Sequence, residues 1–427
     1  MLLQFRIKNH RSFRELAELS FVSTNRKDEP AFRIECAHTE HGVLPVVGIW
    51  GANASGKSNL IHALHFFRSA VQNSHARWEP TRPVSWWPWG LVTTGPDAHP
   101  TTMEIDLVVE SVRFTYGFEI YQGEFVREHL FRWERARRQV LFTRDVAAKE
   151  SPWHFGPSLK GQRARIAEAT RSNSLYLAAA AQENHPLLTS VYEAIVRGVH
   201  FERPYDLRGF PLFQPNAHIL EESFRQSLLE LLRAADVGIS GIRVETHDPS
   251  PALDAAVSMF RPEFAEEVRK KMPNEDGRFL LFVHGDVDGW ELPPEDESRG
   301  TQILLARLSD IVATLKTGGL LVLDEIDSSL HPDLCVALVK LFTSAETNPR
   351  GAQLLFTTHD RDLLTTLRTD EVLLVDKNRN GVSSLAAASD YREVRSRENL
   401  RDVHEQGRIR GVPVLGDFAQ ALNQREA

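Results

Sequence analysis

The chain has 427 residues, a net charge of −8 and an isoelectric point near 6.1. Hydrophobic residues make up 42% and charged residues 25%, the composition of an ordinary globular protein long enough for two compact units. The acidic balance argues against a protein that coats nucleic acid, and because no apolar run approaches the length of a membrane span we expect no membrane partner.

The first predicted element is a strand over residues 2–8, with no signal-peptide pattern before it. Only two cysteines occur, Cys36 and Cys335, and both suit small core positions. Few cysteines and no leader pattern predict a cytoplasmic protein.

A phosphate-binding loop is predicted at residues 51–58, which read Gly-Ala-Asn-Ala-Ser-Gly-Lys-Ser. The apolar run 45–50 before it predicts a buried strand, and residues 59–64 continue as a helix whose positive end faces the loop. In this pattern Lys57 reaches the β- and γ-phosphates and the Ser58 hydroxyl holds Mg²⁺. The predicted nucleotide-binding residues here are Gly51, Asn53, Ala54, Ser55, Gly56, Lys57, Ser58 and Asn59.

The middle of the chain reads as a sheet followed by helices. Runs at 102–109, 112–120 and 125–133 alternate apolar and polar residues and predict an antiparallel meander. The next segment, about 148–275, is predicted to be mostly helical and, without sustained heptads, to form a compact lid. Arginines cluster at 132–138 and 160–171. They fit either a groove for a phosphate backbone or a solvated face, and the interspersed acids favour the solvated face.

A second helix suited to anions is predicted near residue 299. Ser298-Arg299-Gly300-Thr301-Gln302 precedes an amphipathic helix, residues 303–316. Ser298 is a good N-cap residue and Gly300 lets a phosphate approach the backbone. By itself this sequence predicts only a capped helix. Its place directly before an acidic strand makes it a candidate phosphate contact.

Two further strands carry candidate catalytic groups. Residues 318–325 form an apolar run that ends in Asp324, which can orient the Mg²⁺ shell, and Glu325, which can polarise an attacking water. After a helix at 332–345, the run 353–360 carries His359 at the end of its apolar part. The plain alternatives are an acidic turn and a structural histidine. In a parallel sheet, however, both strands end at the edge where ligands bind.

The four motifs, in this order, resemble those of the ABC-type ATPases of the SMC/RecF group. The resemblance implies that 51–58 is the Walker A loop, 298–302 the signature motif and 320–325 Walker B. It also implies that 328–331 is the D-loop and His359 the switch histidine.

The residues at 5–13, 324–332 and 405–413 are similar to those of the OLD-like ATPases, many of which add a Toprim nuclease domain. Residues 360–427 are too few for that domain. Arg299, Thr301 and His331 depart from the transporter pattern, and no Q-loop or base-reading residue is assigned.

The resemblance implies an α/β fold, an ABC-type P-loop ATPase head with a mixed sheet flanked by helices, an antiparallel β-subdomain and a helical insert. The predicted division is an N-terminal ATPase half, a helical insert, a C-terminal ATPase half and a tail, at 1–147, 148–275, 276–390 and 391–427.

The implied activity is hydrolysis of ATP to ADP and phosphate, with Glu325, His359 and Lys57 as catalytic residues. ATP and Mg²⁺ are the implied cofactors, and Ser58 and Asp324 hold the metal. Two copies would pair head to tail, as a homodimer or within a larger homo-oligomer, so that ATP on one copy meets Ser298 and Gly300 of the other.

The OLD-like resemblance further implies anti-phage defence with a separately encoded nuclease or toxin as effector. Two alternatives stay open. One is a RecF-like repair ATPase that binds DNA, and the other is an ATP-stabilised scaffold with little turnover. DNA or RNA is thus a possible partner.

Overall fold

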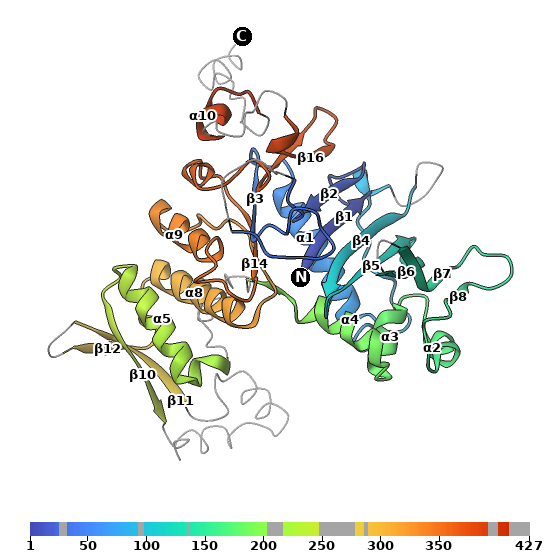
Figure 1. Ribbon diagram of the computed structural model, residues 1–427, viewed down its shortest axis with the longest axis horizontal. Helices are drawn as coiled ribbons and strands as arrows, with labels where there is room; N and C mark the ends of the chain where they lie inside the picture. The colour runs from blue at the N-terminus through green and yellow to red at the C-terminus, as the bar shows by residue number, and fades with distance from the viewer. Residues whose placement is uncertain are drawn as a thin grey trace, which may run out of the picture. The chain divides into compact units, whose positions relative to one another are not determined.

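The computed structural model describes residues 1–24, 32–92, 98–134, 137–202, 217–246, 278–285, 289–391 and 400–409. The chain forms two compact units, both drawn in Figure 1. Unit 1 comprises Met1–Phe201, Thr317–Ser328 and Cys335–Ala427, and unit 2 comprises Glu202–Lys316 and Ser329–Leu334.

The first sheet of unit 1 has six strands in the order β16-β15-β3-β14-β13-β9. All neighbours are parallel except β15 and β16. The strands β3, β13 and β14 are buried along their whole length, as expected for strands covered on both faces. The strands are β3 (Val46–Trp50), β9 (Val199–Phe201), β13 (Leu320–Leu323), β14 (Gln353–Thr357), β15 (Val372–Lys377) and β16 (Ser383–Ala387).

The second sheet of unit 1 is antiparallel and has the order β2-β1-β4-β5-β6-β7-β8. Strands β4 to β8 pair in chain order, which confirms the meander predicted from the alternating runs. The strands are β1 (Leu2–Lys8), β2 (Ala17–Ser20), β4 (Thr101–Val109), β5 (Val112–Tyr121), β6 (Glu124–Glu134), β7 (Arg137–Asp145) and β8 (Trp153–Phe155).

Helix α1 (Lys57–Asn73) joins the two sheets of unit 1 into one core. Its Phe67 ring lies 5.6 Å from that of Phe5 on β1 and 5.0 Å from that of Phe118 on β5. The same apolar cluster takes in strands of the six-stranded sheet. The shorter helices α3 (Tyr176–Gln182) and α4 (Pro186–Val196) pack against α1. The position of α1, which follows the phosphate-binding loop directly, is therefore fixed on several sides.

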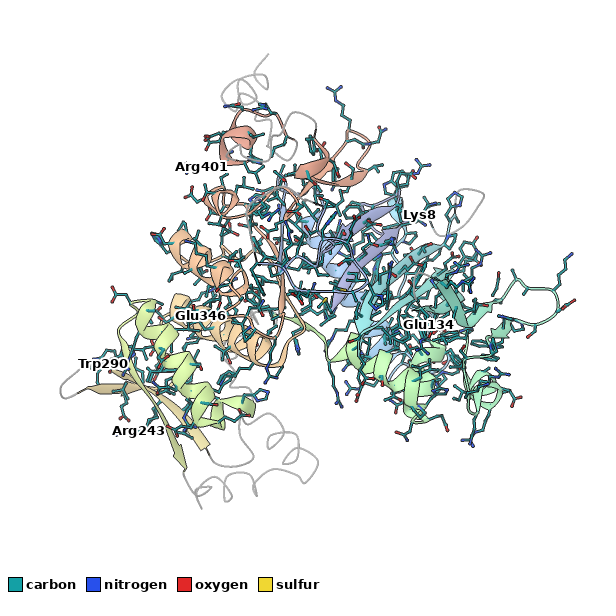
Figure 2. All side chains as sticks on the ribbon, viewed as in Figure 1. Lys8, Glu134, Arg243, Trp290, Glu346 and Arg401 are labelled. Carbon is teal, nitrogen blue, oxygen red and sulfur yellow. The ribbon has the colours of Figure 1, made fainter. Side chains whose placement is uncertain are left out.

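Unit 2 is a small α/β layer. Its three strands pair antiparallel in the order β10-β11-β12, and Figure 2 labels Arg243 on β10 and Trp290 on β12. Helix α5 is amphipathic, buries Phe224, Leu228 and Leu232, and packs against β10. These elements are α5 (Glu222–Ala234), β10 (Ile239–Thr246), β11 (Arg278–His284), β12 (Trp290–Leu292) and α8 (Arg299–Thr317).

The division into units differs from the predicted one. The segment predicted as a helical insert, 148–275, is split, because α3 and α4 pack on α1 and belong to unit 1. Of the remainder, β8, α2 (Arg163–Ala169) and β9 also belong to unit 1, whereas α5 and β10 belong to unit 2, where β10 pairs with β11 beyond residue 275. The candidate signature helix α8 also lies in unit 2 instead of in the C-terminal half of the ATPase. Of the predicted tail, 391–427, only residue 391 and residues 400–409, with α10 (Leu400–Glu405), are described.

The arginines of the 160–171 cluster are used inside unit 1. On helix α2 (Arg163–Ala169), Arg163 Nη1 donates to the carbonyl oxygens of Gly156 and Leu159 at 3.2 Å each. Arg171 Nη2 donates to the carbonyl oxygens of Ser74 and His75 at 3.0 and 3.1 Å. Because these side chains hold loop carbonyls together, the structure favours a structural role over a phosphate groove at this cluster. In the part of the chain that the structure describes, no helix has the length and apolarity to cross a bilayer.

Candidate functional site

The phosphate-binding loop connects β3 to α1 and is clamped from two sides. Ser383 of β16 donates its hydroxyl to the carbonyl oxygen of Ser55 at 2.5 Å and its N–H to that of Ser12 at 2.7 Å. Gly56 has φ +121°, and a Cβ built on it would lie 2.6 Å from Ser383 Oγ and 2.9 Å from Ser12 Oγ. Only glycine fits this position without moving the clamp.

Two buried polar side chains of the loop, Lys57 and Ser55, have groups that can donate hydrogen bonds to a phosphate. Lys57, 6% exposed, donates from Nζ to the carbonyl oxygen of Gly51 at 2.8 Å. Burial lowers the pKa of Lys57, and the carboxylates of Glu325, Asp324 and Asp327 oppose that shift. Among the described residues Ser55 Oγ has no hydrogen-bond partner, although Ser55 is only 4% exposed. A glycine cradle with a buried ammonium and an orphaned hydroxyl at a helix N-terminus fits a polyphosphate.

The acids follow β13 and are held by the neighbouring strand. Asp324 is half-buried and Glu325 is exposed, with φ +55°. The hydroxyl of Thr357, at the end of β14, donates to Asp324 Oδ1 at 2.5 Å and accepts the Glu325 N–H at 2.8 Å. Thr357, fully buried, was not among the residues predicted from the sequence. The sequence feature that could have pointed to Thr357 is a hydroxyl residue at the last position of β14, the strand that pairs with β13.

His359 leaves the same strand two residues later and is exposed. Its N–H donates to Asp327 Oδ2 at 3.3 Å. Strand β14 lies between β3 and β13, so its end adjoins both the loop and the acids. His359 therefore follows the strand that pairs with both the loop strand β3 and the acid strand β13, and its role stays a prediction.

Residues before the loop also reach it. Asn59 Nδ2 donates to Ser12 Oγ at 2.8 Å, and Arg11 Nη1 donates to Asn59 Oδ1 at 3.3 Å. The Arg11 guanidinium lies 5.5 Å from the centre of the Trp87 ring, and burial lowers its pKa. Arg11 and Ser12 lie in the stretch 5–13 that resembles the OLD-like ATPases, and they are not among the predicted site residues.

A divalent cation would need oxygen ligands from both protein and phosphate. The described residues contain no group of three or more His, Cys, Asp or Glu placed to hold a metal. Mg²⁺ commonly takes only one or two protein ligands and completes its shell with phosphate and water. Ser58, exposed in the first turn of α1, and Asp324 are the predicted pair, and both lie in unit 1.

The candidate signature residues lie in unit 2. Ser298 Oγ accepts the N–H of Thr301 at 3.2 Å and lies 2.8 Å from Thr301 Oγ1, so Ser298 caps α8 as predicted. Gln302 Nε2 donates to the carbonyl oxygens of Glu295 and Glu297 at 3.1 and 2.8 Å. A Cβ on Gly300 would make only ordinary contacts, at 3.6 Å or more. Within unit 2, packing therefore does not explain the glycine. Ser298 and Arg299 are exposed.

Residues 46–365 match the family described as "AAA domain, putative AbiEii toxin, Type IV TA system", well over half of the chain. The chain belongs to this AAA-domain family. Membership in the AAA-domain family and the strand order of the sheets together confirm the predicted fold class, an α/β P-loop ATPase head of ABC type. No curated protein matches the chain in sequence.

Several solved structures are similar to the AAA-domain chain in backbone structure. An SMC head bound to the C-terminal winged-helix domain of ScpA has 15% identity and TM-score 0.42, covering 90% of this chain and 97% of the other. The SMC head domain from Thermotoga maritima has 14% identity and TM-score 0.40, covering 90% and 98%. An SMC head with an extended coiled coil, bound to the C-terminal domain of ScpA from Pyrococcus furiosus, has 14% identity and TM-score 0.41, covering 96% and 99%. Similarity at this level says nothing about substrate or partner.

Proposed function

We propose that the chain hydrolyses ATP with Mg²⁺ and that ATP joins two copies head to tail. The observation that supports this proposal best is the place of β14 between β3 and β13. That order brings Lys57, the acids Asp324 and Glu325, and His359 to the carboxyl edge of one sheet. Both halves of a phosphoryl-transfer site, a phosphate cradle and a carboxylate beside it, are then present in unit 1.

Each group has a role that its surroundings permit. The loop N–H groups and Lys57 bind the phosphates, and Lys57 exchanges its carbonyl partner, Gly51, for a phosphate oxygen. Ser58 and Asp324 would hold Mg²⁺, which would neutralise phosphate charge. Glu325 accepts a proton from the attacking water, and His359 contacts the γ-phosphate.

The pairing rests on the signature residues. Ser298, Arg299, Gly300 and Thr301 lie in unit 2, at the N-terminus of a 19-residue helix, with Ser298 and Arg299 exposed. A helix N-terminus with an exposed cap suits a phosphate from another copy. ATP that binds the closed pair better than the separate copies shifts the population toward the pair, and hydrolysis releases it.

The partner is proposed from the family description. A Type IV toxin–antitoxin family and the OLD-like motifs both support a prokaryotic defence role in which the ATPase controls a separately encoded nuclease or toxin. Direct DNA binding in the manner of RecF has less support, because the arginines of the 160–171 cluster hold backbone carbonyls.

Three variants test the activity. Glu325→Gln should bind ATP, lose turnover by at least about a hundredfold and shift from monomer to dimer with ATP in light scattering. Lys57→Ala should lose both ATP binding and dimerisation. Glu346→Gln, an exposed carboxylate between α9 (Pro332–Phe342) and β14 that is labelled in Figure 2, is the matched control and should behave as wild type.

The outcomes separate the alternatives. Normal turnover by Glu325→Gln would rule out the proposed base. ATP-dependent dimerisation of the wild type with almost no turnover would indicate the scaffold. Binding of duplex DNA that weakens steeply with salt would support the repair ATPase.

A further inference from the structure

Thr357 joins the two acids that the proposed activity needs. Its single hydroxyl donates to the side chain of Asp324 at 2.5 Å and accepts from the backbone of Glu325 at 2.8 Å. A hydroxyl has one hydrogen to donate, so donation to Asp324 and acceptance from Glu325 are complementary and fix its rotation. The residue is 0% exposed, so water does not compete for either bond.

The backbone of Thr357 strengthens the same link. Its carbonyl oxygen accepts the N–H of Ile326 at 3.0 Å, and the Glu325 carbonyl accepts the N–H of Ser328 at 2.8 Å. The turn after β13 is thereby tied to the end of β14. Side chain and main chain of one residue hold three successive residues of the acidic turn, Asp324 to Ile326.

The turn needs such support because Glu325 is strained. Its φ of +55° lies in the left-handed region, which is unfavourable for a residue other than glycine. The N–H bond to Thr357 Oγ1 helps to hold that conformation. Glu325 is the second residue after β13, and the bond to Thr357 fixes the backbone at this position, so the direction in which the chain leaves the sheet depends on Thr357.

We propose that Thr357 is a positioning residue that orients the Asp324 carboxylate toward Mg²⁺ and fixes the backbone of Glu325 for proton abstraction. The inference rests on the proposed ATPase function and deepens it. Asp324 is restricted because one of its oxygens is occupied by the hydroxyl, which sets the direction of the other. Thr357 touches neither nucleotide nor water in this scheme and acts through the acids.

The direct test is Thr357→Val, which keeps the β-branched shape and deletes the hydroxyl. We expect kcat to fall about 10- to 100-fold, as for other groups that orient metal ligands, and the Mg²⁺ concentration for half-maximal rate to rise several-fold. The KM for ATP should change by no more than about twofold, because the phosphate cradle is intact. Thr357→Ser restores the hydroxyl and should recover most of both values.

The control is Thr314→Val. Thr314 is a buried residue of α8, 2% exposed, whose hydroxyl donates only to the carbonyl oxygen of Asp310, at 2.7 Å, among the bonds that the structure describes for it. Its loss should lower stability without moving the Mg²⁺ requirement. If Thr357→Val does not fold, Thr357→Cys, of similar size and a weak donor, takes its place.

Two results would overturn the inference. One is a Thr357→Val enzyme with normal kcat and normal Mg²⁺ requirement, and the other is a Thr357→Ser enzyme as impaired as Thr357→Val, which would indicate packing alone. If the wild type shows no turnover, the proposed function fails instead. The Mg²⁺ dependence of ATP binding in wild type and Thr357→Val then decides whether Thr357 orients Asp324.

Discussion

At the scale of single residues, the loop depends on the absence of a side chain at Gly56. Gly56→Ala places a Cβ within 2.6 Å of Ser383 Oγ and 2.9 Å of Ser12 Oγ, at a φ of +121°. Either the clamp opens or the first turn of α1 moves, and in both cases the N–H groups lose their common centre. We expect ATP affinity to fall at least about tenfold, measured by isothermal titration calorimetry.

The matched control is Gly381→Ala. Gly381 also has a positive φ, +77°, but a Cβ there meets nothing within 4 Å. Both variants place alanine at a positive φ, but only Gly56→Ala adds the steric contact with Ser383 and Ser12. Equal loss of ATP affinity in both would show that the contact with Ser383 and Ser12 has no part in the loop's geometry.

At the scale of elements, sequence reasoning succeeded where a motif is contiguous. Strand, glycine loop and helix around Lys57 lie within one short stretch, so their local chemistry predicts their geometry. The same holds for the meander, whose alternation is visible in each strand. The place of His359 followed from a rule about parallel strands, and the strand order agrees.

The parts that could not be predicted are long-range contacts. Thr357 meets Asp324 from another strand, and Ser383 meets Ser55 across more than 300 residues. Nothing local marks either hydroxyl. Strand β10 lies inside the segment predicted to be mostly helical and pairs with β11, which begins beyond residue 275, and no local pattern marks that pairing.

That sheet leads to a prediction about the signature loop. His284 of β11 pairs with Glu297 at 2.6 Å and stacks on Trp290, with ring centres 4.4 Å apart. Glu297 directly precedes Ser298 and is only 8% exposed. His284→Ala leaves this carboxylate buried without its ring partner, which costs on the order of 1–3 kcal/mol and loosens the loop.

We expect His284→Ala, combined with Glu325→Gln, to weaken ATP-driven dimerisation about tenfold while ATP binding to the monomer stays normal. Analytical ultracentrifugation and titration of a fluorescent ATP analogue measure the two. Arg243→Ala is the control, because it breaks the exposed ion pair with Glu291 on the same sheet and leaves His284 in place. Unchanged dimerisation in the double variant would show that His284 on the three-stranded sheet does not support the signature residues.

At the scale of the whole molecule, one buried acid far from the site links stability to pH. Glu371, 4% exposed, directly precedes β15, and its carbonyl oxygen accepts the Gly48 N–H at 2.8 Å. Burial raises the pKa of Glu371 from 4.5 to about 7. The charge of Asp370 adds to this shift, and the hydrogen bond from the Arg368 backbone opposes it. Because β3 and β15 are parallel, Glu371 lies at the opposite edge from the phosphate-binding loop.

The direction of the effect follows from proton binding. Between pH 4.5 and about 7 the folded chain keeps a proton on Glu371 that the unfolded chain releases, so stability falls as pH rises through this range and then levels. The full difference corresponds to at most roughly 3 kcal/mol. Burial lowers the pKa of His10 to about 3 and of His62 to about 4, so these histidines give the opposite slope below 6.5.

Comparing Glu371→Gln with wild type removes the contribution of the histidines, because both proteins contain them and only the titration of Glu371 differs. The introduced amide cannot ionise and can still accept the Arg368 N–H that the glutamate accepts at 2.9 Å. The melting temperature of Glu371→Gln should exceed that of wild type at about pH 8, and the gap should close at about pH 5. Glu346→Gln, an exposed acid, should show no gap at either pH. A gap of the same size at both pH values would mean that Glu371 stays ionised in the folded chain. ATP affinity should be equal in all three proteins, since the loop and Glu371 lie at opposite ends of the sheet, so pH changes the stability of the fold without changing the site.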